Sequence, residues 1–184
     1  MKGCGKMSSE FWQKDFLKVE ELIKEKKLKD AEHLLQTLIT HENPHCSLQA
    51  QMRLARLHMQ EEQFADAIQI FKGMKPSDLK SDDWKLMISG MCSLSDTKTF
   101  QEAWLKYSKV LEDGALEDWV SVSCEWLHAA TKLKVKPVIE VELDRLEKYY
   151  AELPSLDDSF LGMRKIPFHS DFISLAKSAK QVIQ

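Results

Sequence analysis

The chain has 184 residues, of which 43% are hydrophobic and 30% are charged, and its formal net charge at pH 7 is −3. This composition is typical of a globular domain with a sizeable core, and the acidic balance excludes the broad electrostatic attraction of a basic chain to nucleic acid or anionic membranes. No apolar run approaches the roughly 18–20 residues that a membrane span needs. The first residues lack the apolar stretch of a secretory signal, so we expect a cytoplasmic protein without membrane insertion.

The four cysteines, Cys4, Cys46, Cys92 and Cys124, are widely spaced and include no Cys-x-x-Cys pair. This spacing suits a reducing compartment better than a disulfide framework. We therefore expect free thiols that are mostly buried.

Apolar residues recur at helical spacing, and no stretch alternates apolar and polar residues for long enough to predict a strand. Asn43-Pro44 is expected to end the second helix, because the residue before a proline is pushed out of the α region. Gly73 ends the fourth helix, and Pro137 fits the first turn of the eighth. Ser170 is expected to cap the last helix after a loop over 154–170. The predicted helices cover, in chain order, residues 9–25, 28–41, 45–60, 63–73, 81–94, 99–112, 116–132, 136–153 and 171–183.

Three alanines, Ala31, Ala67 and Ala103, lie 36 residues apart, and their neighbours repeat with them. A shared period of this length predicts stacked helical hairpins, with each alanine at a close helix crossing where no larger side chain fits. We therefore predict an all-α, right-handed superhelical solenoid of about four helical hairpins with a C-terminal capping helix. The repeating neighbours, three residues before and four and seven after each alanine, are Leu28, Phe64 and Phe100; Leu35, Phe71 and Tyr107; and Leu38, Met74 and Val110.

The second hairpin resembles the tetratricopeptide repeat. Its Leu54-Ala55, His58, Phe64, Ala67-Ile68 and Phe71 have the residue types and spacings of that motif, and the third hairpin keeps Gly90, Phe100, Ala103 and Tyr107. The resemblance is clearest over residues 45–112. It is weaker in the first hairpin, where Val19 replaces a small residue, and in the fourth, where Ile139 replaces alanine. The expected organisation is a flexible N-terminus (1–8), a repeat domain (9–153), and a loop and capping helix of the same domain (154–184).

The resemblance implies a concave groove that binds a peptide or an amphipathic helix, because in this family the first helix of each hairpin lines such a groove. Met87 and Met91 are alternatively interpreted as filling gaps in the core, and Arg53 and Arg56 as a solvated face. The first hairpin would add Gln13, Phe16 and Glu20. The positions that carry over to the second and third hairpins are Gln49, Met52, Arg53, Arg56, Met59, Trp84, Met87, Ile88 and Met91.

The residue pattern contains no catalytic constellation, so we expect no enzyme and no cofactor. His41, His45 and Cys46 resemble metal ligands in spacing, but Asn43-Pro44 separates the histidines and no second cluster completes a site. Repeats of this family that bind chaperone tails use a clamp of Lys and Asn; here Phe16 and Glu20 stand at two of those positions, which disfavours that co-chaperone role.

The expected function is therefore a non-catalytic protein–protein interaction module of the adaptor or chaperone-like kind. The alternative is a structural subunit of a larger complex, and the acidic balance disfavours an RNA-binding helical repeat. The apolar residues of 160–168 and the last helix are interpreted as a cap on the open end of the stack. Occupation of the protein's own groove and exchange within a homodimer stay open as alternatives.

Overall fold

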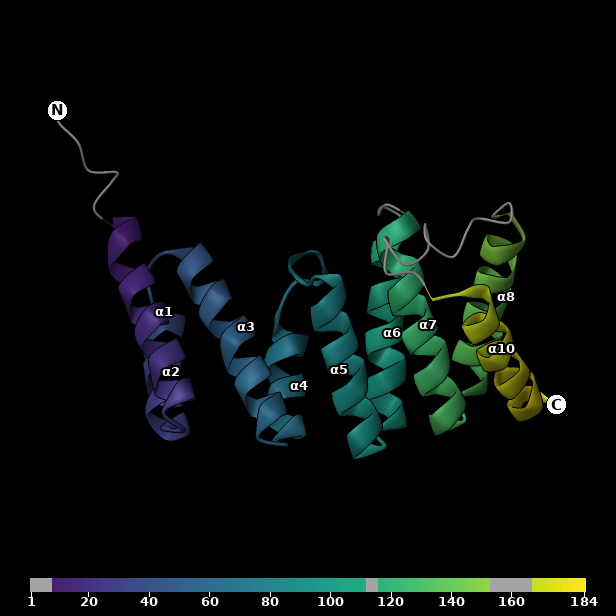
Figure 1. Cartoon of the computed structure of the whole chain (residues 1–184), viewed down its shortest axis with the longest axis horizontal. Coiled ribbons are helices and arrows are strands. Elements are labelled where there is room, and N and C mark those ends of the chain that lie inside the picture. Colours follow the sequence, from purple (N-terminus) through teal and green to yellow (C-terminus); the bar gives the residue numbers. More distant parts are fainter. Residues whose placement is uncertain (1–7, 112–115, 153–166) are drawn as a thin grey trace, which may run out of the picture. The chain divides into compact units, whose positions relative to one another are not determined.

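The computed structural model describes residues 8–111, 116–152 and 167–184. Within these residues the regular structure is helical and contains no strand, which confirms the predicted all-α helical repeat. None of the helices in this part of the chain is long and apolar enough to cross a membrane. The elements are α1 (Ser8–Lys24), α2 (Leu28–Ile39), α3 (Pro44–Gln60), α4 (Phe64–Gly73), the 3-10 turn η1 (Pro76–Asp78), α5 (Ser81–Leu94), α6 (Thr97–Leu111), α7 (Leu116–Leu133), α8 (Lys136–Glu152) and α10 (His169–Ile183) (Figure 1).

The prediction that Asn43-Pro44 ends the second helix was wrong. α2 already ends at Ile39, and Asn43-Pro44 instead forms the start of α3. The Asn43 side chain accepts hydrogen bonds from the backbone N–H groups of His45 and Cys46, at 2.9 and 3.3 Å. Pro44 is the first residue of α3, a position where its missing N–H leaves no hydrogen bond unmade. A proline that ends one helix by its effect on the preceding residue can equally start the next.

The last helix also begins earlier than predicted. Its N-cap is Phe168, whose backbone is extended, and its first residue is His169, so Ser170 lies inside the first turn and does not cap the helix. Of the predicted loop over 154–170, residues 154–166 lie outside the described residues.

The two helices of each hairpin are joined through one non-glycine residue with a left-handed backbone. These residues are Lys26, Glu62, Ser95 and Lys134, with φ between 54° and 61°. In the second hairpin, the N–H group that follows Glu62 donates to the carbonyl oxygen of His58 at 2.8 Å, which closes the end of α3 as in a Schellman motif. The repeated turn conformation supports the assignment of repeated hairpins.

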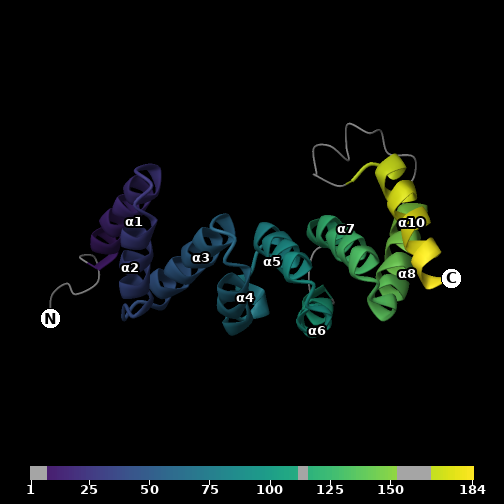
Figure 2. The same ribbon diagram turned by 90° about the horizontal axis from the view of Figure 1, so that it is seen from below.

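The chain forms two compact units, Met1–Phe71 and Lys72–Gln184, and the division between them falls inside α4. In the first unit, α2 packs against both α1 and α3 (Figure 2). Ala31 is completely buried, as the repeat pattern predicted, and so is Ala67 in α4. The core of this unit consists of Phe16, Val19, Ala31, Leu35, Leu38, Cys46, Ala50, Leu54 and Leu57.

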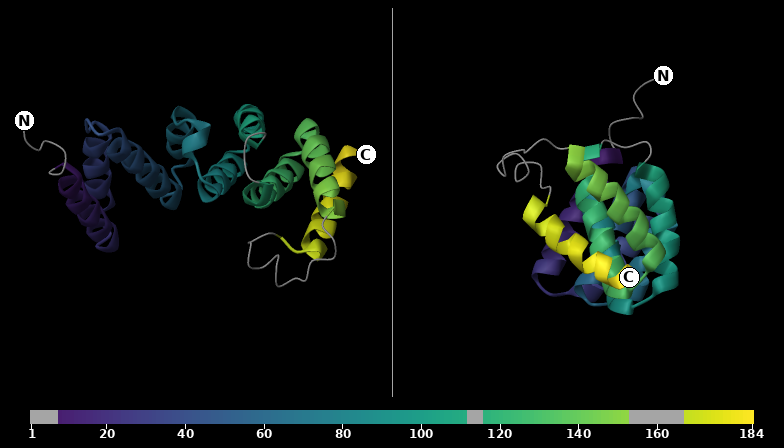
Figure 3. Two further views of the ribbon diagram at one scale, coloured as in Figure 1. Left: turned by 90° about the horizontal axis from the view of Figure 1, so that it is seen from above. Right: turned by 90° about the vertical axis from the view of Figure 1, so that its right-hand side faces the viewer.

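In the second unit, α7 packs against α5, α6 and α8, and α10 packs against α7 and α8 (Figure 3). Trp126 of α7 is completely buried. Its ring centroid lies 4.8 Å from that of Phe100, 5.6 Å from that of Tyr107 and 6.4 Å from that of Trp84, all within the range of favourable aromatic pairs. This aromatic cluster joins α5, α6 and α7 into one core.

Candidate functional site

The first helices of two successive hairpins, α1 and α3, meet at Arg53. Arg53 Nη1 lies 2.8 Å from Glu20 Oε1, and the guanidinium carbon lies 4.5 Å from the ring centroid of Phe16. The Arg53 side chain remains 33% exposed and that of Glu20 49% exposed. The guanidinium is therefore held from two sides by α1 while part of it stays accessible to solvent.

Around Arg53, one side of each helix is open. Steps of about 100° per residue place Gln13, Leu17 and Glu20 on one side of α1, and Gln49, Arg53 and Arg56 on one side of α3. Leu17 is 60% exposed although it is a large apolar residue. We refer to these residues as the α1–α3 face: Gln13, Leu17, Glu20, Gln49, Arg53 and Arg56.

Of the groove positions predicted on α3, the structure leaves Gln49, Arg53 and Arg56 at least partly exposed on one face. Met52 is buried and Met59 is half-buried. The family positions place the methionines beside the polar residues, whereas the burial of each side chain depends on the neighbouring helix. The sequence-based prediction did not include Leu17. Its spacing from Gln13 and Glu20, four and three residues, places it on the same side of α1 and could have indicated it.

The positions predicted on α5 belong to the second unit and are buried. Trp84, Met87 and Met91 are 5%, 3% and 0% exposed. The ring of Trp84 contacts Tyr107 and Trp126 within the aromatic cluster. The burial of Met87 and Met91 fits the alternative interpretation that they fill gaps in the core.

The histidines considered as metal ligands take part in the start of α3. His41 Nδ1 accepts a hydrogen bond from the backbone N–H of Asn43 at 3.0 Å, and the ring of His45 lies edge-on to Trp12. Cys46 is a buried free thiol, as Cys124 is, and Cys92 is a half-buried one. Across the described ranges there is no group of three or more His, Cys, Asp or Glu side chains that could hold a metal ion.

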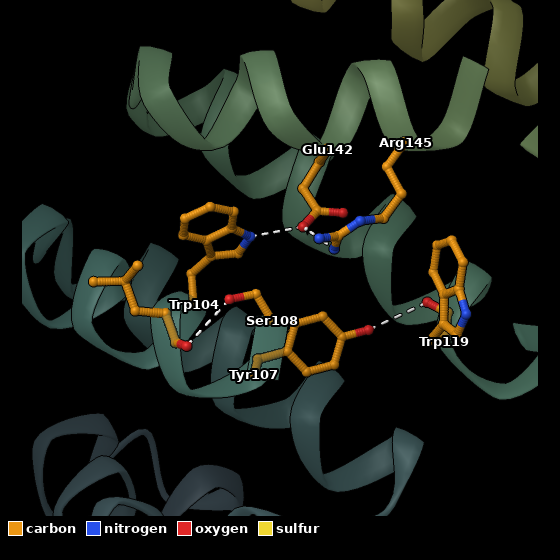
Figure 4. A network of polar contacts seen from close by, with 7 residues as sticks. Trp104, Tyr107, Ser108, Trp119, Glu142 and Arg145 are labelled. Atoms are coloured by element: carbon orange, nitrogen blue, oxygen red, sulfur yellow. Dashed lines mark hydrogen bonds and ion pairs between the residues drawn. The ribbon is translucent and has the colours of Figure 1, made fainter. Parts of the chain in front are cut away.

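A second polar arrangement lies inside the second unit, around Glu142 of α8 (Figure 4). Its carboxylate is completely buried, and Oε1 accepts hydrogen bonds from Trp104 Nε1 at 2.7 Å and from Arg145 Nη1 at 2.9 Å. Within the part of the chain that the structure describes, Oε2 has no hydrogen-bond partner of ordinary geometry, and neither has the buried hydroxyl of Ser123. Nearby, the hydroxyl of Tyr107 donates to the carbonyl oxygen of Trp119 at 3.3 Å.

Burial raises the pKa of Glu142 above its ordinary value, although the charge of Arg145, the hydrogen bond from Trp104 and the nearby Ser123 hydroxyl act in the opposite direction. The carboxylate has no exposed surface, and its hydrogen-bond partners come from α6 and α8. It therefore links these two helices inside the core.

Comparison with known proteins bears on the first of these arrangements. Residues 22–89 match the family model described as tetratricopeptide repeat, a stretch that contains α2, α3 and α4 whole and parts of α1 and α5. This match confirms the resemblance read from the second hairpin. No curated protein and no solved structure matches the chain.

Proposed function

We propose that this chain is a non-catalytic protein-interaction module that binds a peptide or helical segment of a partner protein on the α1–α3 face. Tetratricopeptide repeats generally mediate protein–protein interactions, and the matched residues include α3 and the end of α1. The observation that carries the proposal is the arrangement at Arg53, where an ion pair and an aromatic ring hold a partly exposed guanidinium.

A guanidinium that is already held loses little side-chain entropy when it binds a partner. It has five N–H donors, and the single bond to Glu20 leaves others for a partner carboxylate or carbonyl. The exposed Leu17 adds apolar area that is favourable to bury, at about 25 cal/mol per Å². The amides of Gln13 and Gln49 can donate to and accept from an extended or helical backbone. We therefore expect the partner's segment to carry an apolar residue that packs against Leu17 and an oxygen atom that accepts a hydrogen bond from Arg53.

The experiment introduces a photo-crosslinking amino acid at Gln49, and in a separate sample at Gln69 as the matched control. Gln69 is an exposed glutamine of α4 in the same unit and lies outside the α1–α3 face. Each variant is irradiated in native lysate, and the attached proteins are identified by mass spectrometry. We expect one protein to be captured at Gln49 in at least tenfold excess over Gln69.

The captured protein is then produced and titrated against the chain and against Leu17→Asp. Because Leu17 is largely exposed, this substitution should leave the helix content unchanged in circular dichroism. Binding that weakens tenfold or more supports the proposal. Equal capture at both positions, or equal affinity of Leu17→Asp and the wild type, would show that the partner binds elsewhere. The dissociation rate of the same complex, measured in a separate kinetic experiment, distinguishes an adaptor that releases its partner from a fixed subunit of a complex.

A further inference from the structure

α10 is anchored to α8 near both of its ends. The ring of Phe172 stacks on that of Tyr150, with centroids 4.3 Å apart and planes at 8°. The Tyr150 hydroxyl donates to the carbonyl oxygen of Pro167 at 2.8 Å, and Lys180 pairs with Glu147 at 2.7 Å. These contacts hold the start of α10 in place beside α7, so a space between the two helices is formed before any ligand arrives.

A pocket of about 330 Å³ lies between α7 and the start of α10. Pro167, Phe172 and Leu175 supply apolar lining from the α10 side. Cys124 of α7 also lines it, and burial raises the pKa of this thiol to about 12, so the thiol is neutral at pH 7 and behaves as a small apolar group. The volume lies at the lower end of the range for ligand pockets and suits one side chain rather than a cofactor.

The exposed lining of this pocket is acidic. Glu125 of α7 and Asp171 of α10 bring carboxylates from two different helices, and both residues are exposed. His128 is the other polar side chain in the lining. No lysine or arginine is among the described residues that line the pocket. The complementary ligand is therefore a cation with an apolar stem.

We propose that the α7–α10 pocket receives one arginine side chain of a partner polypeptide. The methylene groups of arginine can cover Phe172 and Leu175 while the guanidinium stays at the exposed carboxylates. A planar guanidinium can bond to carboxylates on two sides at once, which a lysine ammonium does less well. The pocket lies wholly in the second unit, so this proposal and that for the α1–α3 face can fail independently.

The test uses ¹⁵N-labelled full-length chain and a synthetic seven-residue peptide with one central arginine, blocked at both ends. The matched peptide carries citrulline, which has nearly the same shape as arginine but no charge. We expect saturable shifts of backbone amides in residues 124–128 and 167–175 with the arginine peptide, and at least fivefold weaker binding of the citrulline peptide.

Two double variants complete the experiment. Glu125→Gln with Asp171→Asn removes both carboxylates of the pocket and should weaken binding of the arginine peptide at least fivefold. Glu140→Gln with Asp144→Asn removes two exposed carboxylates of α8 outside the pocket and should leave the affinity unchanged.

Three results would overturn the proposal. These are the absence of saturable shifts up to millimolar peptide, equal binding of the two peptides, and equal affinity of the pocket variant and the wild type. Asp171 also lies in the first turn of α10, where an acidic side chain stabilises the helix. A pocket variant that only melts at a lower temperature would therefore assign the carboxylate to helix stability.

Discussion

Two of the buried tryptophans of the second unit, Trp104 and Trp126, allow the effect of one chemical change to be compared in two settings. Trp126 is 0% exposed and its indole N–H has no hydrogen-bond partner among the described residues, whereas Trp104 is 9% exposed and its N–H donates to the buried carboxylate of Glu142 at 2.7 Å. Substitution by phenylalanine removes about three ring atoms at either position. The difference between the two variants therefore reports on the N–H group.

The magnitudes follow from two opposing effects. Loss of three buried ring atoms costs about 2 kcal/mol at either site. For Trp126→Phe, removal of an unsatisfied buried donor stabilises the folded state by about 1–3 kcal/mol. We therefore expect a free energy of unfolding within about 1 kcal/mol of that of the wild type. For Trp104→Phe, loss of a hydrogen bond to a charged group adds about 1.5–3 kcal/mol to the destabilisation. We therefore expect the free energy of unfolding to fall by about 4 kcal/mol in total.

The assay is urea unfolding at pH 7 and 25 °C, followed by far-UV circular dichroism so that the loss of a tryptophan does not change the probe. Both substitutions lie in the same unit, and equal m-values will show that the same surface unfolds in both variants. If the two variants lose the same stability within about 0.5 kcal/mol, hydrogen bonding of the indole does not decide the outcome and the reasoning is refuted. A loss of about 3 kcal/mol for Trp126→Phe alone would show that its N–H is satisfied.

Further predictions concern both units. Burial raises the pKa of Glu142, so the native state holds its proton more tightly than the unfolded chain, and this residue's contribution to stability falls as pH rises from the unfolded value of about 4.3 to the folded pKa. Glu142→Gln should remove this part of the pH dependence, and urea midpoints with an unchanged slope between pH 4 and 8 would contradict it. Glu62→Gly should raise the free energy of unfolding by about 0.5–1 kcal/mol, because glycine adopts the left-handed turn without strain; a lower urea midpoint would argue against this. A double-mutant cycle on Glu20 and Arg53 should give a coupling of about 0.5–1 kcal/mol that shrinks in 1 M salt, and a salt-independent coupling would exclude the ion pair as its source. Ala67→Leu should lower the free energy of unfolding by about 1–3 kcal/mol because Ala67 has no exposed surface, and an unchanged melting temperature would refute the close crossing.

The helices and the repeat could be predicted because their signals are local. The spacing of apolar residues follows the 3.6-residue turn, so the start of α5 at Ser81 and the end of α3 at Gln60 agreed with the prediction. The turn at Glu62 could not be foreseen in the same way. Its left-handed backbone is usually occupied by glycine, and a glutamate at that position gives no signal.

The surface of the candidate site was predicted only in part. Arg53 and Arg56 share a face because they are three residues apart, a relation that can be read from the chain. Met87 was assigned to the same groove by its family position, yet it is buried, in a helix that packs against α6 and α7. Leu17 has a large apolar side chain, of the kind expected in the core, but is largely exposed.

By itself the sequence determined that this protein is a helical repeat, because a period of 36 residues and a helical spacing of apolar side chains are properties of the chain. Only the tertiary structure decided which polar groups lie inside. Glu142 and Arg145 form an i, i+3 ion pair on α8, but the Glu142 carboxylate is buried and bonds to the indole of Trp104, 38 residues earlier in the chain. Burial depends on contacts between distant residues, and no local pattern contains them.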